Sequence, residues 1–175
     1  MKHRHSNKNP RAQHCVHGFG IMGNMKIHIG SDHAGFRLKE LLRAWLTEQG
    51  HEVVDHGASE ANPDDDYPDF IVPVAQSVSR DPKARGVILG GSGQGEAMVA
   101  NRFLKVRAAV YYGGPEQIIT LAREHNDANI LSLGARLLSF EDAKRAVSLF
   151  LTTPFSAQIR HARRLAKIEA LDTKR

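Results

Sequence analysis

From Lys26 onward, short apolar runs alternate with longer stretches in which apolar residues recur every three or four positions. The short runs are typical of strands, and the longer stretches are typical of amphipathic helices that pack on a sheet. This alternation predicts repeated strand-helix-strand units. We therefore expect one α/β domain, a three-layer α/β/α sandwich with a five-stranded, parallel, Rossmann-like sheet.

The pattern also predicts where each element lies. The expected strands are Lys26–Gly30, Glu52–Asp55, Gly86–Gly90, Val106–Tyr111 and Asn129–Leu133. A first helix begins at Phe36 and ends before Gly50, and a second begins at Pro68 and ends before Asp81, because glycine and proline favour helix boundaries. Further helices are expected near Gly95–Arg102, Pro115–Glu124, Phe140–Leu151 and Ser156–Leu171.

Residues 1–24 differ from the rest of the chain in charge. Of the 24 Lys and Arg residues, Lys2, Arg4, Lys8 and Arg11 lie here, without any of the 19 acidic residues. The formal charge of +5 therefore belongs mostly to this segment, and the remaining chain is nearly neutral. We expect residues 1–24 to be a disordered extension before a single domain at 25–175, with Met25 as an alternative start, and we expect no nucleic-acid partner.

The single cysteine, Cys15, also lies in this extension. One cysteine allows neither an internal disulfide nor a cysteine zinc cluster, which fits a reducing compartment. The stretch Val16–Met25 is too short and too polar for a signal peptide or a membrane span. We therefore expect a cytoplasmic protein with no membrane partner.

The densest chemical signal is the glycine-rich segment from Gly90 to Glu96, GGSGQGE, between a predicted strand and a helix. Glycines let backbone N–H groups converge on one point, which suits a phosphate or the oxyanion of an enediolate. A tight turn without a ligand is the alternative. A dinucleotide site is disfavoured, because the glycines lack the G-x-G-x-x-G spacing and no Walker lysine follows.

Two further signals follow strands at the same predicted edge of the sheet. Glu96 can accept a proton from carbon beside the loop N–H groups, or it can simply complement the helix dipole. In Ser31-Asp32-His33, the imidazole can bind a phosphate or a hydroxyl, although Ser31 or Asp32 also suits a helix N-cap and a loop histidine is often only solvated.

The last two signals lie later in the chain. His125-Asn126-Asp127 suits proton transfer to a ring oxygen and binding of hydroxyls, or it forms only a turn. Arg160 and Arg164 stand four residues apart on one helical face, where two guanidinium groups can clamp a phosphate or remain solvated.

Taken together, these segments resemble the type B ribose-5-phosphate isomerases, a family that includes galactose-6-phosphate isomerase subunits. The resemblance covers Lys26 to Ile168 and rests on IGSDHAGFRLKE, DYPDF, GGSGQGEAMVANR, RAAVYY, AREHNDANILSLGAR and RHARRLAKI, in that order. It implies a Rossmann-like domain without metal or other cofactor. It also implies a homodimer or a tetramer with active sites between subunits, where the C-terminal helix at 156–171 reaches the partner.

The resemblance further implies a role for each matching residue. The implied sugar ligands are Asp32, Tyr67 and Asn126. The implied phosphate ligands are His33, Arg136, Arg160 and Arg164, the last two from the partner subunit. His125 matches the group that opens the sugar ring, and Ser92 with Gly91, Gly93 and Gly95 matches the loop that binds the enediolate.

The chain departs from the family pattern in three places. Many members have a cysteine base where this chain has Gly90, and a second branch uses a glutamate, which implies that Glu96 is the base. The segment YYGGPEQ is longer than in close relatives, and Phe103-Leu104-Lys105 replaces a Pro-Gly turn, both near the expected pocket rim.

The resulting hypothesis is an isomerase that interconverts ribose 5-phosphate and ribulose 5-phosphate through a cis-enediolate. Two alternatives stay open. The substrate could be another phosphosugar, such as allose or galactose 6-phosphate or a tetrulose phosphate, or the domain could bind phosphosugars without turnover.

Overall fold

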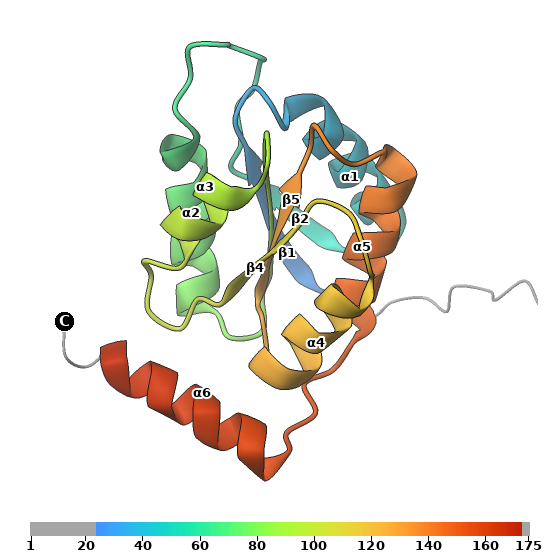
Figure 1. Ribbon diagram of the computed structural model, residues 1–175. Coiled ribbons are helices and arrows are strands. Elements are labelled where there is room, and N and C mark those ends of the chain that lie inside the picture. Colours follow the sequence, from blue (N-terminus) through green and yellow to red (C-terminus); the bar gives the residue numbers. More distant parts are fainter. Residues whose placement is uncertain (1–23, 173–175) are drawn as a thin grey trace, which may run out of the picture.

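The computed structural model describes residues 24–172, so the expected disorder of residues 1–23 lies outside the described part of the chain. The elements, in chain order (Figure 1), are β1 Lys26–Ser31, α1 Phe36–Glu48, β2 Glu52–Asp55, α2 Tyr67–Arg80, β3 Arg85–Gly90, α3 Gln94–Ala100, β4 Ala108–Tyr111, α4 Gln117–Asn126, β5 Ile130–Gly134, α5 Phe140–Thr152 and α6 Ile159–Asp172. Every predicted strand and helix is present.

Several predicted boundaries differ from the structure by one to three residues, and for two of them the reason is identifiable. β4 begins at Ala108 rather than Val106, because the Val106 N–H closes a turn onto Phe103 and the Arg107 N–H bonds the Asn129 side chain. α6 begins at Ile159 rather than Ser156, because Ala157 has a φ of 51°. A left-handed backbone at a residue with a Cβ interrupts a right-handed helix.

The five strands form one parallel sheet in the order β2-β1-β3-β5-β4. α2 and α3 cover one face, while α1, α4 and α5 cover the other (Figure 1). The predicted three-layer α/β/α sandwich is therefore confirmed. No helix in residues 24–172 is both long enough and apolar enough to cross a bilayer.

Alternating strand residues supply two apolar cores, one on each face of the sheet. Val87 and Leu89 of β3 pack toward α1 and α5, whereas Ile88 between them packs toward α2. All three side chains are fully buried. Burying a side chain of this size contributes about 1.5–3 kcal/mol, so β3 is a central source of stability.

The path of the chain creates a crevice at the carboxyl ends of the central strands. β1 and β3 are neighbours, yet β1 leads into α1 on one face and β3 leads into α3 on the other. Ligands of open parallel sheets bind at such a reversal. This edge carries the glycine-rich segment and Asp32.

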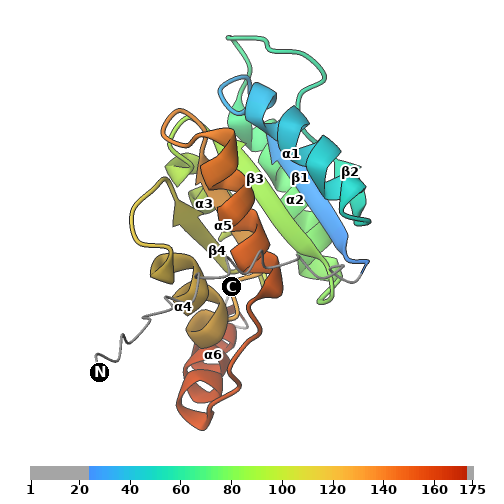
Figure 2. The same cartoon turned by 90° about the vertical axis from the view of Figure 1, so that its right-hand side faces the viewer.

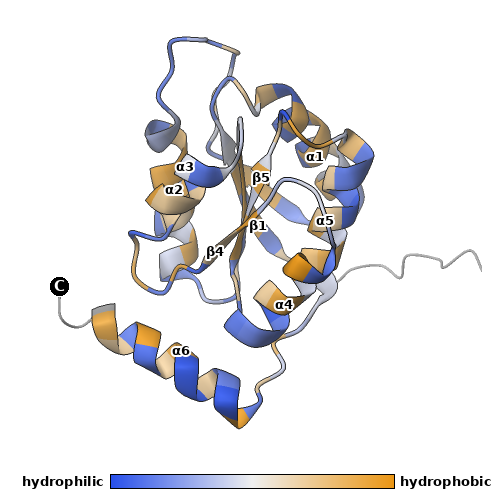
Figure 3. Ribbon diagram, in the orientation of Figure 1, coloured by the Kyte–Doolittle hydropathy of each residue, from blue (hydrophilic) through white to orange (hydrophobic). Residues whose placement is uncertain are grey.

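α6 stands apart from the sandwich (Figure 2), and its main contact with another helix or strand is with α4. Its sequence mixes apolar and charged residues (Figure 3). Leu165 is buried against the body, whereas Ile159, Ile168 and Leu171 are exposed. The helix therefore presents apolar surface that residues 24–172 leave uncovered.

Candidate active site

The glycine-rich segment forms a rigid turn from β3 into α3. Gly93 has a φ of 77°, and a Cβ there would lie 3.0 Å from the Leu133 carbonyl carbon, so this position requires glycine. The Ser132 hydroxyl donates a 2.6 Å hydrogen bond to the Gly93 carbonyl from inside the protein. The turn is thus fastened to β5 as well as to β3.

The carboxylate of Glu96 folds back beneath this turn. Glu96 is only 5% exposed, and a Cβ on Gly90 would overlap its carboxylate. Burial raises the pKa of Glu96; a hydrogen bond with its own backbone N–H opposes the rise, and the nearby charge of Asp32 adds to it. A carboxylate with a raised pKa is a better proton acceptor at neutral pH.

Three side chains from outside the turn border it: those of Tyr67, Arg136 and Leu137. The Tyr67 ring at the start of α2 packs against Gly95, where a Cβ would lie 2.9 Å from its hydroxyl. Arg136 follows β5, and its backbone N–H donates to the Gly91 carbonyl at 3.2 Å. An open depression is lined by Tyr67, Gly91, Ser92, Gly95, Glu96, Arg136 and Leu137.

Asp32 and His33 follow β1 at the same edge. One oxygen of Asp32 accepts the N–H groups of Ala34 at 3.0 Å and Gly35 at 3.2 Å, which closes a turn before α1. The expectation that Ser31 or Asp32 is the helix N-cap is wrong, because Gly35 is the N-cap of α1 and no side chain caps that helix. His33 is not a free loop histidine, because both its ring and its backbone N–H bond the Asp65 carboxylate. The sequence analysis did not identify Asp65 as a site residue.

Asp32, His33 and Asp65 are also the group of residues that could hold a metal ion, since one ligand atom from each lies within 4.8 Å of the others. Their atoms are already engaged in hydrogen bonds, however. One oxygen of Asp32 accepts two backbone N–H groups, and both oxygens of Asp65 bond His33. This arrangement suits a hydrogen-bonded cluster better than a cation cage.

The remaining candidates lie at the opposite edge of the sheet, where the strands begin. His125 and Asn126 end α4 just before β5, and Arg160 and Arg164 lie exposed on α6. β5 rises by about 3.3 Å per residue, so its five residues separate the two edges by roughly 15 Å. One chain therefore does not bring this second group to Glu96.

The second group has an organising residue of its own, His161, which is 2% exposed. Its ring stacks on His125 with centroids 4.1 Å apart and planes 16° apart. Its Nε2 accepts a 3.0 Å hydrogen bond from the Arg160 Nε, while its Nδ1 has no partner among the described residues. His161 links the candidate proton donor His125 to the candidate phosphate ligand Arg160.

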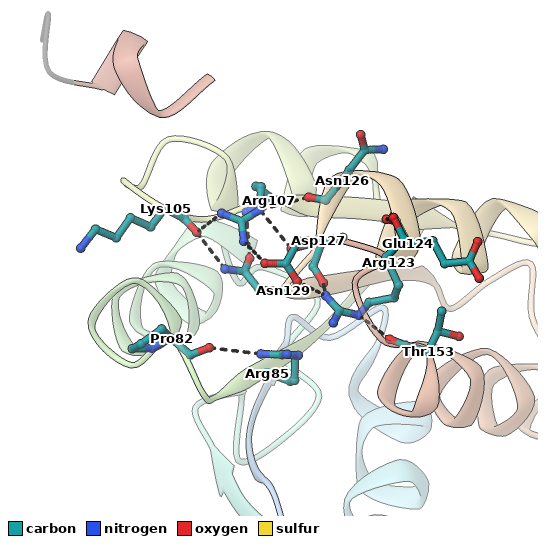
Figure 4. Close-up of polar contacts among 12 residues, drawn as sticks. Pro82, Arg85, Lys105, Arg107, Arg123, Glu124, Asn126, Asp127, Asn129 and Thr153 are labelled. Atoms are coloured by element: carbon teal, nitrogen blue, oxygen red, sulfur yellow. Dashed lines mark hydrogen bonds and ion pairs between the residues drawn. The ribbon is translucent and has the colours of Figure 1, made fainter. Parts of the chain in front are cut away.

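The turn after α4 is held by two arginines (Figure 4). Asp127 has a φ of 44°, and its carboxylate accepts from Arg107 at 2.7 Å and from Arg123 at 2.8 Å. The Arg107 Nε also donates to the carbonyls of Asn126 at 3.1 Å and Asp127 at 3.0 Å. The sequence interpretation missed both arginines, although the four-residue spacing of Arg123 and Asp127 signals an ion pair on a helix.

Comparisons with known proteins show the family to which this chain belongs. Residues 27–168 match the family model described as Ribose/Galactose Isomerase. The chain belongs to the ribose/galactose isomerase family. A ribose-5-phosphate isomerase B from Mycolicibacterium paratuberculosis is 41% identical over 141 residues, which cover 81% of this chain and 87% of that protein. Its counterpart from Escherichia coli is 36% identical over 152 residues, covering 86% and 98%.

Solved structures of the ribose/galactose isomerase family agree in fold. The Clostridium thermocellum ribose-5-phosphate isomerase B gives a TM-score of 0.80 at 40% identity, covering 86% of this chain and 99% of that one. The Mycoplasma genitalium enzyme, with bound ribulose-5-phosphate, gives 0.82 at 35% identity, covering 86% and 98%.

The three departures from the ribose/galactose isomerase pattern differ in position. A side chain at position 90 would collide with the Glu96 carboxylate. A cysteine at position 90 is therefore incompatible with the observed position of the Glu96 side chain. Tyr112 does border the turn, because a Cβ on Gly134 would lie 2.7 Å from the Tyr112 Cβ. Residues 103–105 precede β4 at the opposite edge, where Phe103 and Lys105 line a hollow together with Asn126.

Proposed function

We propose that this protein is an aldose-ketose isomerase that interconverts ribose 5-phosphate and ribulose 5-phosphate. The observation that carries the proposal is the buried Glu96 carboxylate beneath a fixed, glycine-rich turn. A base next to convergent N–H donors is what proton transfer between two sugar carbons requires. Relatives named ribose-5-phosphate isomerase B, about two-fifths identical over most of the chain, support this substrate.

The reaction begins with ring opening, in which His125 donates a proton to the ring oxygen as the bond between that oxygen and C1 breaks. The O1 hydroxyl releases its proton to solvent, and C1 becomes the aldehyde carbon. Glu96 then removes the proton from C2, and the electron pair forms the C1–C2 double bond while negative charge moves to O1. Ser92 and the N–H groups of Gly91, Gly93 and Gly95 stabilise this cis-enediolate. A proton passes from O2 to O1, Glu96 returns its proton to C1, and C2 becomes the carbonyl carbon.

The other residues hold the substrate in register. Asp32, Tyr67 and Asn126 bind hydroxyls, while His33, Arg136, Arg160 and Arg164 bind the phosphate. Planar guanidinium groups pair with phosphate oxygens in a defined geometry, so the clamp fixes C1 and C2 relative to the base. The scheme uses side chains and backbone groups of this chain without metal or other cofactor.

Each active site is completed by a second copy of the chain. His125, Asn126, Arg160 and Arg164 lie about one strand length from Glu96, too far to share its substrate within one chain. α6 carries the two arginines together with exposed Ile159, Ile168 and Leu171, a mixture that suits a protein partner. In this assembly residues 25–175 act as one isomerase domain, and α6 reaches the partner subunit.

The direct test is conversion of ribose 5-phosphate to the ketose by the purified, chelator-treated protein and by the Glu96→Gln variant. Removing a general base costs about 10²–10⁴-fold in rate, so turnover should fall by that much. Glu60→Gln, an exposed position, should leave the rate unchanged and is the matched control. A near wild-type rate in Glu96→Gln would remove Glu96 from the mechanism.

Stability measurements show whether the variant is folded. Because burial raises the pKa of Glu96, the stability that its protonated form confers is lost as the pH rises through the folded pKa. A neutral glutamine avoids this loss, so Glu96→Gln should melt a few degrees higher at pH 7.

The alternatives are separated by a panel of phosphosugars. A higher kcat/KM for allose 6-phosphate, galactose 6-phosphate or a tetrulose phosphate would change the substrate and keep the chemistry. Tight binding without turnover of any of them would favour a phosphosugar-binding domain.

A further inference from the structure

Asp65 holds His33 by two separate hydrogen bonds. One oxygen of Asp65 accepts the backbone N–H of His33 at 2.9 Å, and the other bonds the ring Nδ1 at 2.5 Å. The Asp65 side chain is 8% exposed, whereas the His33 side chain is 28% exposed. A well-buried carboxylate thus anchors a ring that faces the open edge of the sheet.

The chemistry of the pair fixes the orientation of the ring and the position of its hydrogen. An ionised carboxylate can only accept hydrogen bonds, so Nδ1 must carry the hydrogen and Nε2 is the nitrogen left for a ligand. No other hydrogen bond or ion pair of the His33 ring is found among residues 24–172. Asp65 therefore determines which atom His33 offers.

We propose that Asp65 is a positioning residue for phosphate binding and acts through His33. This inference rests on the proposed function, in which His33 binds the substrate phosphate. A ring that donates to phosphate through Nε2 while its Nδ1–H stays on Asp65 is an imidazolium. The Asp65 carboxylate compensates its charge on one side and the phosphate does so on the other.

The Asp65–His33 pair resembles the carboxylate–histidine pairs of metal sites, in which a carboxylate orients the histidine that binds the metal. In such sites, removing the orienting partner costs about 10–100-fold in affinity although it touches no ligand. Asp65 comes from the loop before α2, 32 residues from His33, so loop folding and phosphate binding are coupled.

The test uses Asp65→Asn, with Asp64→Asn as the matched control. An amide has one acceptor oxygen and no charge, so it cannot keep both hydrogen bonds or compensate an imidazolium. Asp64 is exposed, and its substitution removes the same charge one residue away. Asp65→Asn should raise the KM for ribose 5-phosphate about tenfold and change kcat less than about twofold, whereas Asp64→Asn should change neither.

A double-mutant cycle separates this role from a purely structural one. Calorimetric titration with inorganic phosphate should show about tenfold weaker binding in Asp65→Asn. In a His33→Gln background the same substitution should weaken binding less than about twofold, because the coupling is gone. An equal loss in both backgrounds, or no loss in either, would overturn the proposal.

Two readouts do not depend on turnover. Phosphate titration and the ¹⁵N signals of the His33 ring, which report whether Nδ1 carries the hydrogen, can be measured in an inactive protein. Asp65-dependent phosphate binding without isomerisation would refute the proposed function and retain this inference. Isomerisation with Asp65-independent phosphate binding would do the reverse.

Discussion

The two edges of the sheet carry candidate site residues in contrasting states. At the carboxyl edge, Glu96 is buried, Gly93 is bonded to Ser132, and His33 is anchored by Asp65. At the amino edge, Arg160 and Arg164 are exposed on a helix that stands off the body. Glu96 and His33 are thus held in place within one chain, whereas the two arginines proposed to bind phosphate are exposed. This contrast supports the proposal that one copy prepares the site and a second copy completes it.

The largest expected effect tests how tightly the carboxyl edge is packed. In Gly90→Ala, the new methyl group overlaps the Glu96 carboxylate and displaces it from beneath the turn. We expect kcat to fall by about 100-fold or more, since small displacements of a catalytic group have costs of that order. Steady-state kinetics measure the loss.

Gly57 offers a control for the loss of a buried glycine, because a Cβ there meets mainly the flexible Lys39 side chain and the Ser31 backbone N, away from the turn. Gly57→Ala should lower the melting temperature, and it should lower kcat much less than Gly90→Ala does. If kcat is unchanged in Gly90→Ala, the Glu96 carboxylate can move aside and still transfer the proton, so its position beneath the turn is not required.

A smaller effect is expected at the amino edge from Arg107→Ala. The substitution removes donors to the carbonyls of Asn126 and Asp127 and leaves Asp127 with Arg123 alone. The turn that carries His125 and Asn126 should loosen, with about a tenfold loss in kcat/KM and a lower melting temperature.

Arg102→Ala, which changes an exposed arginine five residues earlier in the chain, is the comparison variant for Arg107. Equal kinetics in both variants would contradict a role for Arg107 in setting the position of His125.

The smallest effect concerns acid stability, which should depend on four buried or half-buried histidines. Burial is the largest cause that lowers the pKa of His28, His51, His56 and His161. A lowered pKa stabilises the fold above the unfolded value of about 6.5, and that stability is lost as the pH falls through the folded pKa.

Calorimetry at pH 7.5 and at about pH 5 should therefore show a melting temperature several degrees lower in acid. His51→Asn, which removes one of the four groups, should reduce that difference. A melting temperature independent of pH in this range would show that these histidines are solvated.

The sequence predicted the layers of the fold and the elements on which the candidate residues lie, because hydrophobic periodicity and glycine or proline boundaries are local signals. It did not reveal Asp65, Arg107 or His161 as organising residues. Asp65 meets His33 across 32 residues, and Arg107 meets Asp127 across 20. Such partners depend on how loops fold onto the sheet, and no local pattern encodes them.

The separation of the two groups, by contrast, follows from the predicted parallel sheet. The motifs of Glu96 and His125 both lie next to strands, but one follows a strand and the other precedes one. Only the parallel direction of the strands turns that difference into opposite edges of the sheet.

The central claim, that one site draws on two chains, is tested most directly by complementation between two inactive variants. Glu96→Gln and the double variant Arg160→Ala/Arg164→Ala would be co-expressed with different tags, and the mixed oligomer isolated by tandem purification. If the protein is a dimer with shared sites, one site in each mixed dimer carries no substitution, so about half of the wild-type activity should return. Activity no higher than that of the separate variants would contradict the account.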